Sequence, residues 1–221
     1  MIVRELLAIE GLDKTSEMFR RKLIELSDRL ALDPSMLAAV IAFESGFNPK
    51  ARNPTSKATG LIQFMPDEPD KPGKPGRKGS ASLLGTSIEA LYDMSAERQL
   101  DYVEAYFKMI IDWKGPIETI EDHYLAVFAP AFIGRDPDTV IYAAPSQKYH
   151  QNDALDADQD GAINLTEATA RVIALHEAAK ARPPLFVDMT AEPPSNGIGI
   201  FGAALVVVAS SWAFGRLKRV A

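Results

Sequence analysis

Two consecutive helical segments between residues 18 and 46 constrain the fold more than any other feature of the sequence. Apolar residues recur in the first segment at spacings of three and four, which is the pattern of an amphipathic helix. These residues are Met18, Phe19, Leu23, Ile24, Leu26 and Leu30. Asp33 and Pro34 then occupy the positions of an N-cap and a first helical residue, and Gly46 ends the second helix.

Two further helices are predicted at residues 97–111 and 118–132, with Gly115 and Pro116 between them. No alternating strand pattern competes with these helices, so we expect a mainly α fold. Residues 66–79, PDEPDKPGKPGRKG, combine proline, glycine and charge, and we expect an exposed loop there. At 221 residues, the chain is long enough for one good-sized domain with appendages.

Composition and charge exclude some functions. A net charge of −6 implies no basic surface, which argues against nucleic acid as a partner. The chain has no cysteine, so it uses neither disulfides nor thiolate chemistry. Residues 1–14 carry acids within their short apolar stretch, and we therefore expect no cleavable signal peptide. His123, His150 and His176 show no metal-ligand spacing; His123 is expected at the surface or the core margin, with the edge of the cleft as the alternative.

Glu44 is an acid on the apolar face of the second predicted helix. Leu37, Val40, Ile41 and Glu44 stand at i, i+3, i+4 and i+7, so they share one face. Desolvation and the nearby helix C-terminus both disfavour a negative charge, so we expect the pKa of Glu44 to be raised. A carboxylic acid that stays protonated near neutral pH is suited to general acid catalysis. The alternative is a helix-end acid that simply reaches out to water.

Two blocks around this acid resemble a known family. The blocks ESGFNPKA (44–51) and ATGLIQFMP (58–66) are similar in order and spacing to the motifs of the soluble lytic transglycosylases, in the lysozyme-like superfamily. The wider resemblance covers residues 15–135, and within it QLDYVEAYF and HYLAVFAPAFIG are most similar to phage-encoded members. The chain departs from the family in Lys57, where glycine is common, in the inserted stretch 66–79, and in lacking the later Ala-Tyr-Asn.

The resemblance implies a one-acid mechanism, because no second acid occurs in a comparable motif near Glu44. Glu44 would protonate the oxygen between N-acetylmuramic acid and N-acetylglucosamine, and later take the proton of the C6 hydroxyl to close a 1,6-anhydro ring. The resemblance also implies cleft residues that bind the glycan. These are Ser45, Gln63, Met65, Tyr124, which we expect to supply the family's tyrosine hydroxyl, and Phe128, which aligns with that tyrosine. For Gln63 and Met65 the alternative is ordinary loop packing.

A second motif predicts a metal site. The stretch DADQDGAINLTE, residues 156–167, matches the EF-hand calcium loop, with Gly161 at the sharp turn and Ile163 at the packing position. Oxygen ligands at these spacings favour Ca²⁺, which we expect in a structural role. The predicted ligand residues are Asp156, Asp158, Asp160, Ala162 through its carbonyl, Asn164 and Glu167. The alternative is an acidic turn before a helix.

The end of the chain predicts a membrane anchor. Residues 198–214 form an uncharged stretch that is just long enough for a helix spanning a lipid membrane. Arg216, Lys218 and Arg219 follow, so the positive-inside tendency places the catalytic domain on the opposite side, where peptidoglycan lies. A buried C-terminal core helix is the alternative.

The sequence therefore predicts four parts. They are a lysozyme-like transglycosylase domain (1–144), an EF-hand-like calcium-binding segment (145–182), a Pro-rich linker (183–197) and a transmembrane helix (198–215). We expect a membrane-anchored peptidoglycan lytic transglycosylase, and carriage in a virion membrane would explain the lack of an export signal. Two alternatives stay open: a hydrolysing lysozyme of the same fold, and a non-catalytic peptidoglycan-binding or structural virion membrane protein.

Overall fold

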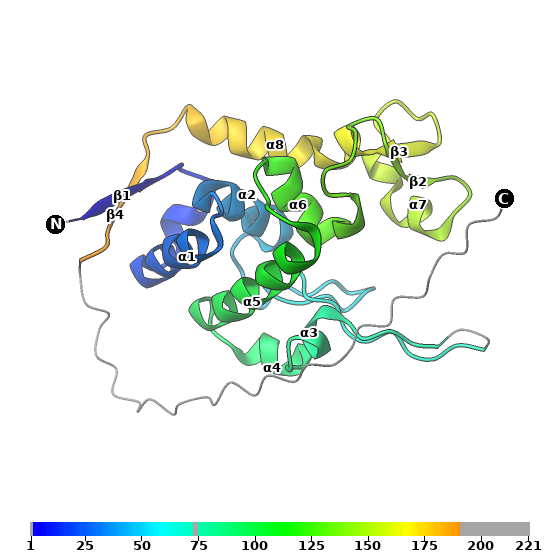
Figure 1. The fold of residues 1–221 in the computed structure, drawn as a ribbon, viewed down its shortest axis with the longest axis horizontal. Coiled ribbons are helices and arrows are strands. Elements are labelled where there is room, and N and C mark those ends of the chain that lie inside the picture. Colours follow the sequence, from blue (N-terminus) through cyan, green and yellow to red (C-terminus); the bar gives the residue numbers. More distant parts are fainter. Residues whose placement is uncertain (1, 73–74, 191–221) are drawn as a thin grey trace. The chain divides into compact units, whose positions relative to one another are not determined.

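A computed structural model describes residues 2–72 and 75–190, which belong to one compact unit (Figure 1). This part of the chain is mainly helical, as expected, with eight α-helices and four short strands. The helices are α1 (Glu17–Leu30), α2 (Pro34–Ser45), α3 (Ser80–Leu83), α4 (Ile88–Asp93), α5 (Ala96–Lys114), α6 (Ile120–Phe128), α7 (Gln147–Asn152) and α8 (Leu165–Lys180). The strands are β1 (Val3–Leu6), β2 (Val140–Ala143), β3 (Ala162–Asn164) and β4 (Leu185–Asp188).

Helix α2 begins and ends where the sequence predicts. The Asp33 carboxylate accepts hydrogen bonds from the backbone N–H groups of Ser35 and Met36 at 2.8 and 2.9 Å, which caps the helix. Gly46 adopts a left-handed conformation, with φ of 58°, and ends it. The sequence between these two signals is almost entirely apolar, so α2 needs other elements on most of its faces.

Helix α2 forms the centre of the core. It packs against α1, α6 and α8, while α1 also packs along α5. The side chains from Leu37 to Ile41 are completely buried. A helix buried in this way is a rigid support, because close-packed interiors resist displacement. The last turn of α2, which carries Glu44, is therefore held firmly in place.

Helix α6 is shorter than the predicted 118–132. It ends at Phe128, and Pro130 begins a single 3-10 turn, Pro130–Phe132. Proline lacks a backbone N–H and disfavours helical geometry in the residue before it. Ala129 accordingly has φ of −152° and leaves the helix.

The four strands were not predicted, and one of them lies in the expected linker. Strand β4 pairs antiparallel with β1, and its Val187 is fully buried. Arg21 on α1 also donates a hydrogen bond to the Asp188 carbonyl oxygen at 3.2 Å. Residues 185–188 are therefore part of the folded unit, because a short apolar stretch finds both a strand partner and a helix to cover it.

The remainder of the expected linker from residue 191 onward, and the expected membrane helix at 198–215, lie outside the described residues. Within residues 2–72 and 75–190, no helix is both long enough and apolar enough to span a membrane. Helix α8 packs against α2 and α6, so the predicted calcium-binding segment belongs to the same compact unit as the helical domain.

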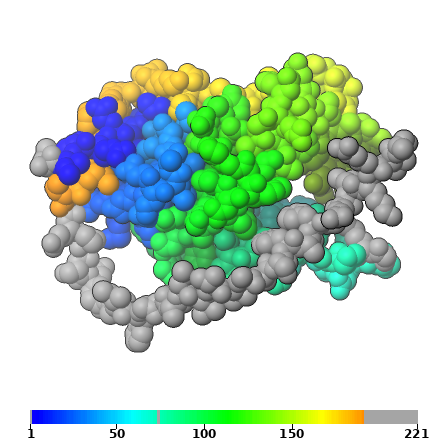
Figure 2. Space-filling view, in the orientation of Figure 1, coloured from blue at the N-terminus to red at the C-terminus, as the bar shows by residue number. Residues whose placement is uncertain are grey.

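The stretch 66–79, which we call the arm, stands away from the helices (Figures 1 and 2). Its side chains are mostly exposed, as the sequence predicts. It is nevertheless paired rather than irregular, because Glu68 and Arg77 form an antiparallel bridge across it.

Candidate active site

Glu44 lies on the last turn of α2, where that helix leaves the core, and its side chain is half-buried. Burial raises the pKa of its carboxyl group from the ordinary 4.5 to about 7. Within the described part of the chain, no hydrogen bond or ion pair to this carboxylate is formed that would offset the desolvation. Near neutral pH, Glu44 is therefore present both as an acid that can donate a proton and as a base that can accept one.

Ser45 joins α2 to the second sequence block. Its hydroxyl lies 3.0 Å from the carbonyl oxygen of Leu61 and 3.0 Å from that of Ile41. The resemblance implied that Ser45 binds the glycan. The structure instead directs its hydroxyl to two backbone carbonyls, so Ser45 positions the two blocks relative to each other.

Gln99, on α5, holds the second block from the other side. Its fully buried side chain accepts a hydrogen bond from the N–H of Leu61 at 2.9 Å and donates to the carbonyls of Pro49 and Leu91, both at 2.7 Å. A side chain at Gly60 would place its Cβ 2.4 Å from the Gln99 Oε1 atom, so glycine is required there. The buried amide thus connects both sequence blocks through their backbones.

Gln63 and Met65 lie on the turn that Gln99 holds. Gln63 adopts a left-handed φ of 52°, and its amide donates to the carbonyl oxygens of Gly60 at 3.1 Å and Ala51 at 3.4 Å. Met65 is 43% exposed. Both residues line a pocket, as described below, although the Gln63 amide nitrogen is already engaged by the loop.

Two tyrosines lie close to Glu44. The negative charge of Glu44 adds to the effect of burial in raising the pKa of the Tyr106 and Tyr124 hydroxyls. Tyr124, on α6, is 3% exposed; its ring stacks on that of Phe128 and meets that of Phe43 edge-on, with centroids 5.4 and 5.3 Å away. The structure therefore places the predicted Tyr124 and Phe128 in one aromatic cluster beside the acid.

Tyr106 was not predicted as a site residue. It lies on α5, and its hydroxyl donates a hydrogen bond to the Ala126 carbonyl oxygen at 2.9 Å. Gln99 and Tyr106 are seven residues apart and so lie on the same face of α5. Their presence as two polar side chains on an otherwise apolar helix face was the signal in the sequence that could have identified Gln99 and Tyr106 as site residues.

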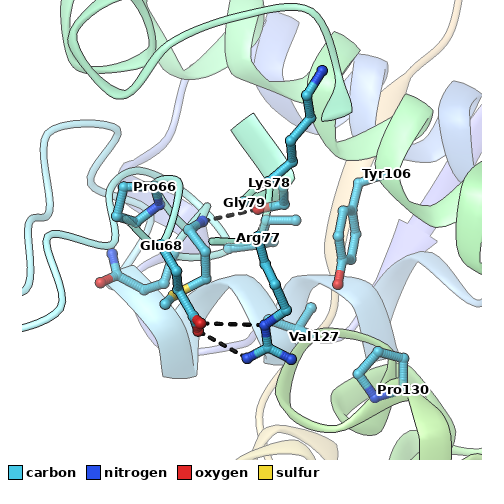
Figure 3. Close-up of a pocket in the computed structure, with 12 residues that line it drawn as sticks. Pro66, Glu68, Arg77, Lys78, Gly79, Tyr106, Val127 and Pro130 are labelled. Atoms are coloured by element: carbon cyan, nitrogen blue, oxygen red, sulfur yellow. Dashed lines mark hydrogen bonds and ion pairs between the residues drawn. The ribbon is translucent and has the colours of Figure 1, made fainter. Parts of the chain in front are cut away.

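A pocket of about 380 Å³ extends from the second block to the arm. Tyr106 lines this pocket and is also close to Glu44, whereas Glu44 itself is not among the lining residues. Figure 3 shows Tyr106, Val127 and Pro130 on one side and the arm residues on the other. The full lining is Ile62, Gln63, Met65, Pro66, Glu68, Arg77, Lys78, Gly79, Ser80, Tyr106, Val127 and Pro130.

The predicted calcium loop brings three carboxylates together. Oxygen atoms of Asp156, Asp158 and Glu167 lie within 4.8 Å of one another. Asp156 is 8% exposed; its Oδ2 accepts hydrogen bonds from the Tyr149 hydroxyl and the Gly161 N–H, while its Oδ1 is buried without a partner. A buried carboxylate oxygen without a partner is costly, and a bound cation would satisfy it. The residues present therefore fit a hard cation.

The other predicted ligands make backbone contacts in this loop. The Asp160 Oδ1 atom accepts a hydrogen bond from the Ala162 N–H at 2.7 Å, and the Asn164 Oδ1 atom accepts one from the Glu167 N–H at 2.9 Å. Glu167 in turn accepts from the Asn164 N–H at 3.0 Å, so these two residues form a capping box at the start of α8. Gly161 has φ of 86°, as the sharp turn requires.

The loop is connected to the aromatic cluster through β2 and β3. These strands pair antiparallel, with Tyr142 opposite Ile163, and Ile163 is fully buried. The Tyr142 ring meets the Phe128 ring edge-on, with centroids 5.9 Å apart. A continuous row of rings therefore leads from the loop to the residues beside Glu44.

His123 differs from the expectation of a surface or core-margin position. His123 on α6 is fully buried and His176 on α8 is 5% exposed. Both face the packed core because α6 lies against α8 and α2. Among the described residues, no hydrogen-bond partner reaches the Nε2 atom of His123 or the Nδ1 atom of His176, although a Glu177 carboxylate oxygen lies 3.8 Å from the latter. Burial lowers the pKa of His123.

A mainly helical domain that presents a desolvated glutamate beside tyrosines fits the lysozyme-like class suggested by the sequence blocks. Residues 22–90 match the family model described as Transglycosylase SLT domain. The matched segment covers less than half of the chain and includes both blocks and most of the pocket's arm side. At the level of the family, this match supports a transglycosylase domain that acts on peptidoglycan. No curated protein and no solved structure matches the chain significantly.

Proposed function

We propose that this protein is a peptidoglycan lytic transglycosylase in which Glu44 is the only catalytic acid and base. The observation that carries the proposal is the desolvated Glu44, with a pKa of about 7, within the segment that matches the transglycosylase family. A pKa close to the working pH allows one group to donate a proton in one step and accept one in the next.

The reaction would proceed in two steps. Glu44 donates its proton to the oxygen between N-acetylmuramic acid and N-acetylglucosamine, and the bond from C1 to that oxygen breaks. The substrate's acetamido oxygen stabilises the positive charge at C1, as in substrate-assisted glycosidases. The Glu44 carboxylate then removes the proton of the C6 hydroxyl, and O6 bonds to C1 to close the 1,6-anhydro ring. Glu44 is thereby reprotonated, and no water is consumed.

The acids that follow the second block support a mechanism with one carboxylate. Most glycosidases use a second carboxylate as nucleophile or base. Here, Asp67 accepts a hydrogen bond from the N–H of Gly79, Asp70 accepts one from the N–H of Gly76, and Glu68 is paired with Arg77. These nearby acids hold the arm together.

The products distinguish this proposal from a hydrolysing lysozyme. We expect the full-length chain to release 1,6-anhydromuropeptides from purified peptidoglycan, identified by mass. Muropeptides heavier by one water, with reducing ends, would contradict the transglycosylase mechanism. Binding without any release would instead indicate the non-catalytic alternative.

We further propose that one Ca²⁺ binds the loop 156–167 as a structural cofactor. Asp156, Asp158 and Glu167 would supply its carboxylate ligands, supported by the buried, unpartnered Oδ1 atom of Asp156. The sequence pattern adds Asp160, the Ala162 carbonyl and Asn164. When bound, the ion would supply positive charge that stabilises the loop.

For the location, we propose that residues 198–215 anchor the chain in a membrane, either cellular or of a virion, with the catalytic domain facing peptidoglycan. The support is the uncharged stretch followed by Arg216, Lys218 and Arg219. We expect the full-length chain to remain with lipid after carbonate extraction. Solubility of the full chain without detergent would contradict the anchor.

A further inference from the structure

The two described sides of the arm, residues 66–72 and 75–79, pair with each other. Glu68 and Arg77 exchange two backbone hydrogen bonds, of 2.8 and 3.1 Å. Their side chains form a two-pronged ion pair, in which the Arg77 Nη2 and Nε atoms lie 2.9 and 3.2 Å from the two carboxylate oxygens. The pair orients the guanidinium from the opposite side of the arm, and both side chains remain accessible, at 64% and 47% exposed.

The base of the arm has no room for additional atoms. A Cβ at Gly79 would lie 2.2 Å from the carbonyl oxygen of Met65, and a Cβ at Gly76 would lie 2.3 Å from that of Glu68. The Asp67 carboxylate also accepts a hydrogen bond from the N–H of Gly79 at 2.7 Å. The two strands of the arm thus meet directly beside the second sequence block.

This base forms one wall of the pocket that Tyr106 shares with the active site. Figure 3 shows the guanidinium of Arg77 held by Glu68 on one side and directed toward Val127 on the other. The remainder of the lining contains apolar surface from Ile62, Val127 and Pro130. Apolar walls with a few fixed polar groups are typical of sites for small ligands or ligand segments.

The chemistry of Arg77 indicates what this wall would bind. A guanidinium has five N–H donors, and two of them are directed to Glu68, which also compensates the positive charge. The remaining donors suit an uncharged oxygen, such as a hydroxyl or an amide carbonyl. A carboxylate would meet the negative charge of Glu68 as well as the donors of Arg77. Sugar rings offer such neutral acceptors together with apolar faces that can lie on the pocket walls.

We propose that the base of the arm is an additional saccharide subsite, in which Arg77 binds a neutral oxygen of the glycan strand and Glu68 positions Arg77. This inference rests on the proposed function, since it assumes that the ligand is a peptidoglycan glycan. Arg77 is a specificity-determining residue, because it makes the protein prefer strands long enough to reach the arm. The acidic stem peptide is not what Arg77 recognises.

The test is a binding experiment that needs no turnover. Full-length chain carrying Glu44→Gln is titrated with purified glycan strands, either long or reduced to a single disaccharide, with and without stem peptides. Adding Arg77→Ala should weaken binding of long strands about tenfold or more, as loss of a hydrogen bond from a charged donor implies. Binding of the disaccharide should not change. Equal affinity for long strands with and without Arg77 would overturn the proposal.

The matched control is Lys71→Ala, which removes one positive charge from the same arm at an exposed residue that does not line the pocket. It should leave affinity unchanged. Arg77→Lys keeps the charge but lacks the planar fork, and it should bind as weakly as Arg77→Ala. Melting temperatures within a few degrees of the parent chain would show that the variants are folded.

The positioning role of Glu68 has its own readout. With Glu68→Gln, Arg77 carries an uncompensated charge, so binding of strands that bear stem peptides should become sensitive to salt. In the parent chain, salt should have little effect at this subsite, and removing the stem peptides should not weaken binding. Strong salt dependence in the parent, abolished by Arg77→Ala, would mean that Arg77 binds an anion and would overturn the neutral-saccharide proposal.

The binding readout separates this inference from the proposed function. If the unmutated chain binds long strands through Arg77 but releases no anhydro product, the catalytic proposal fails and the subsite stands. If anhydro products appear while Arg77 does not affect binding, the subsite alone is wrong.

Discussion

The Ser45 hydroxyl lies 3.0 Å from the Leu61 carbonyl oxygen, and this contact joins the helix that carries Glu44 to the turn that lines the pocket. The backbone N–H of Leu61 donates a hydrogen bond to the side-chain oxygen of Gln99. Both the N–H and the carbonyl group of Leu61 are thus held by side chains, from α5 and α2 respectively. These contacts, made by the side chains of Ser45 and Gln99, set the position of the pocket relative to the catalytic acid. Neither side chain has to contact the substrate to do so.

The buried Gln99 should be essential for stability. Gln99→Leu leaves the N–H of Leu61 and the carbonyls of Pro49 and Leu91 without their partner. Each buried, unsatisfied group costs about 1–3 kcal/mol, so we expect the free energy of unfolding to fall by at least about 2 kcal/mol in urea titrations. The control is Arg98→Ala, which removes an exposed ion pair with Asp101 and a ring contact with Tyr102, and it should cost no more than about 1 kcal/mol. Equal effects would contradict this role of Gln99.

Activity should fall as pH rises through about 7. Burial raises the pKa of Glu44 to about 7, and the protonated form is needed for the first step. On a soluble glycan, kcat/KM should therefore decrease as pH rises above about 7, because less of Glu44 is protonated. A profile that stays flat up to pH 9 would show that Glu44 is not the proton donor.

The same shift affects stability. The folded protein holds the Glu44 proton more tightly than the unfolded chain does, since its pKa is raised from 4.5. The contribution of protonated Glu44 to the free energy of unfolding is fully present below about pH 4.5 and is lost as pH rises through about 7. Glu44→Gln should therefore gain in melting temperature over the parent chain between pH 5 and 8. A constant difference across that range would contradict the raised pKa.

His123 should make the fold sensitive to acid. Its Nδ1 atom lies 2.7 Å from the Thr119 carbonyl oxygen, to which it donates, so the buried Nε2 atom is the one that would have to accept a proton. Burial lowers the pKa of His123, opposed by Asp33 and Asp122 and assisted by His176. The contribution of neutral His123 to stability is therefore fully present above pH 6.5, the ordinary pKa of histidine, and is lost as pH falls below that value. His123→Gln should flatten this dependence, whereas His150→Gln, at an exposed position, should not.

Calcium should raise the melting temperature. A ligand at one hundred times its Kd stabilises the folded state by about 2.7 kcal/mol, and a chelator should reverse the shift. Asp158→Asn should lose most of the shift while keeping a side-chain oxygen for the Asp160 N–H. This variant is a sharper probe than one at Glu167, which also caps α8. Asp138→Asn, an exposed acid outside the cluster, should respond to calcium like the parent chain.

Local signals in the sequence predicted the longer helices α1, α2 and α5 well, whereas the short helices α3, α4 and α7 were not predicted. The Asp33 cap and Gly46 define α2 because both act within one turn of the helix. The acid on its apolar face was predicted to be desolvated for the same reason. The strands were missed because each has only three or four residues, too few to show a pattern, and β1 and β4 are far apart in the chain.

The contacts that assemble the site were harder to predict. Gln99 joins the backbones of Leu61 and Pro49, which are 38 and 50 positions away, and Tyr106 approaches Glu44 only once α5 packs on the other helices. The arm was read as an exposed loop because proline, glycine and charge predict one. The pairing of Glu68 with Arg77 depends on the cross-strand register, which composition does not reveal.

The most direct test of the central claim is the rate of 1,6-anhydromuropeptide release by the full-length chain and by its Glu44→Gln variant. The amide keeps the shape of the side chain but cannot donate and then recover a proton. General acid–base catalysis typically raises a rate by about 10²–10⁴-fold. The release rate of the variant should therefore fall by at least about 10²-fold, while the variant still binds glycan strands. Release of the same product by a folded Glu44→Gln variant at close to the original rate would contradict the assignment of Glu44.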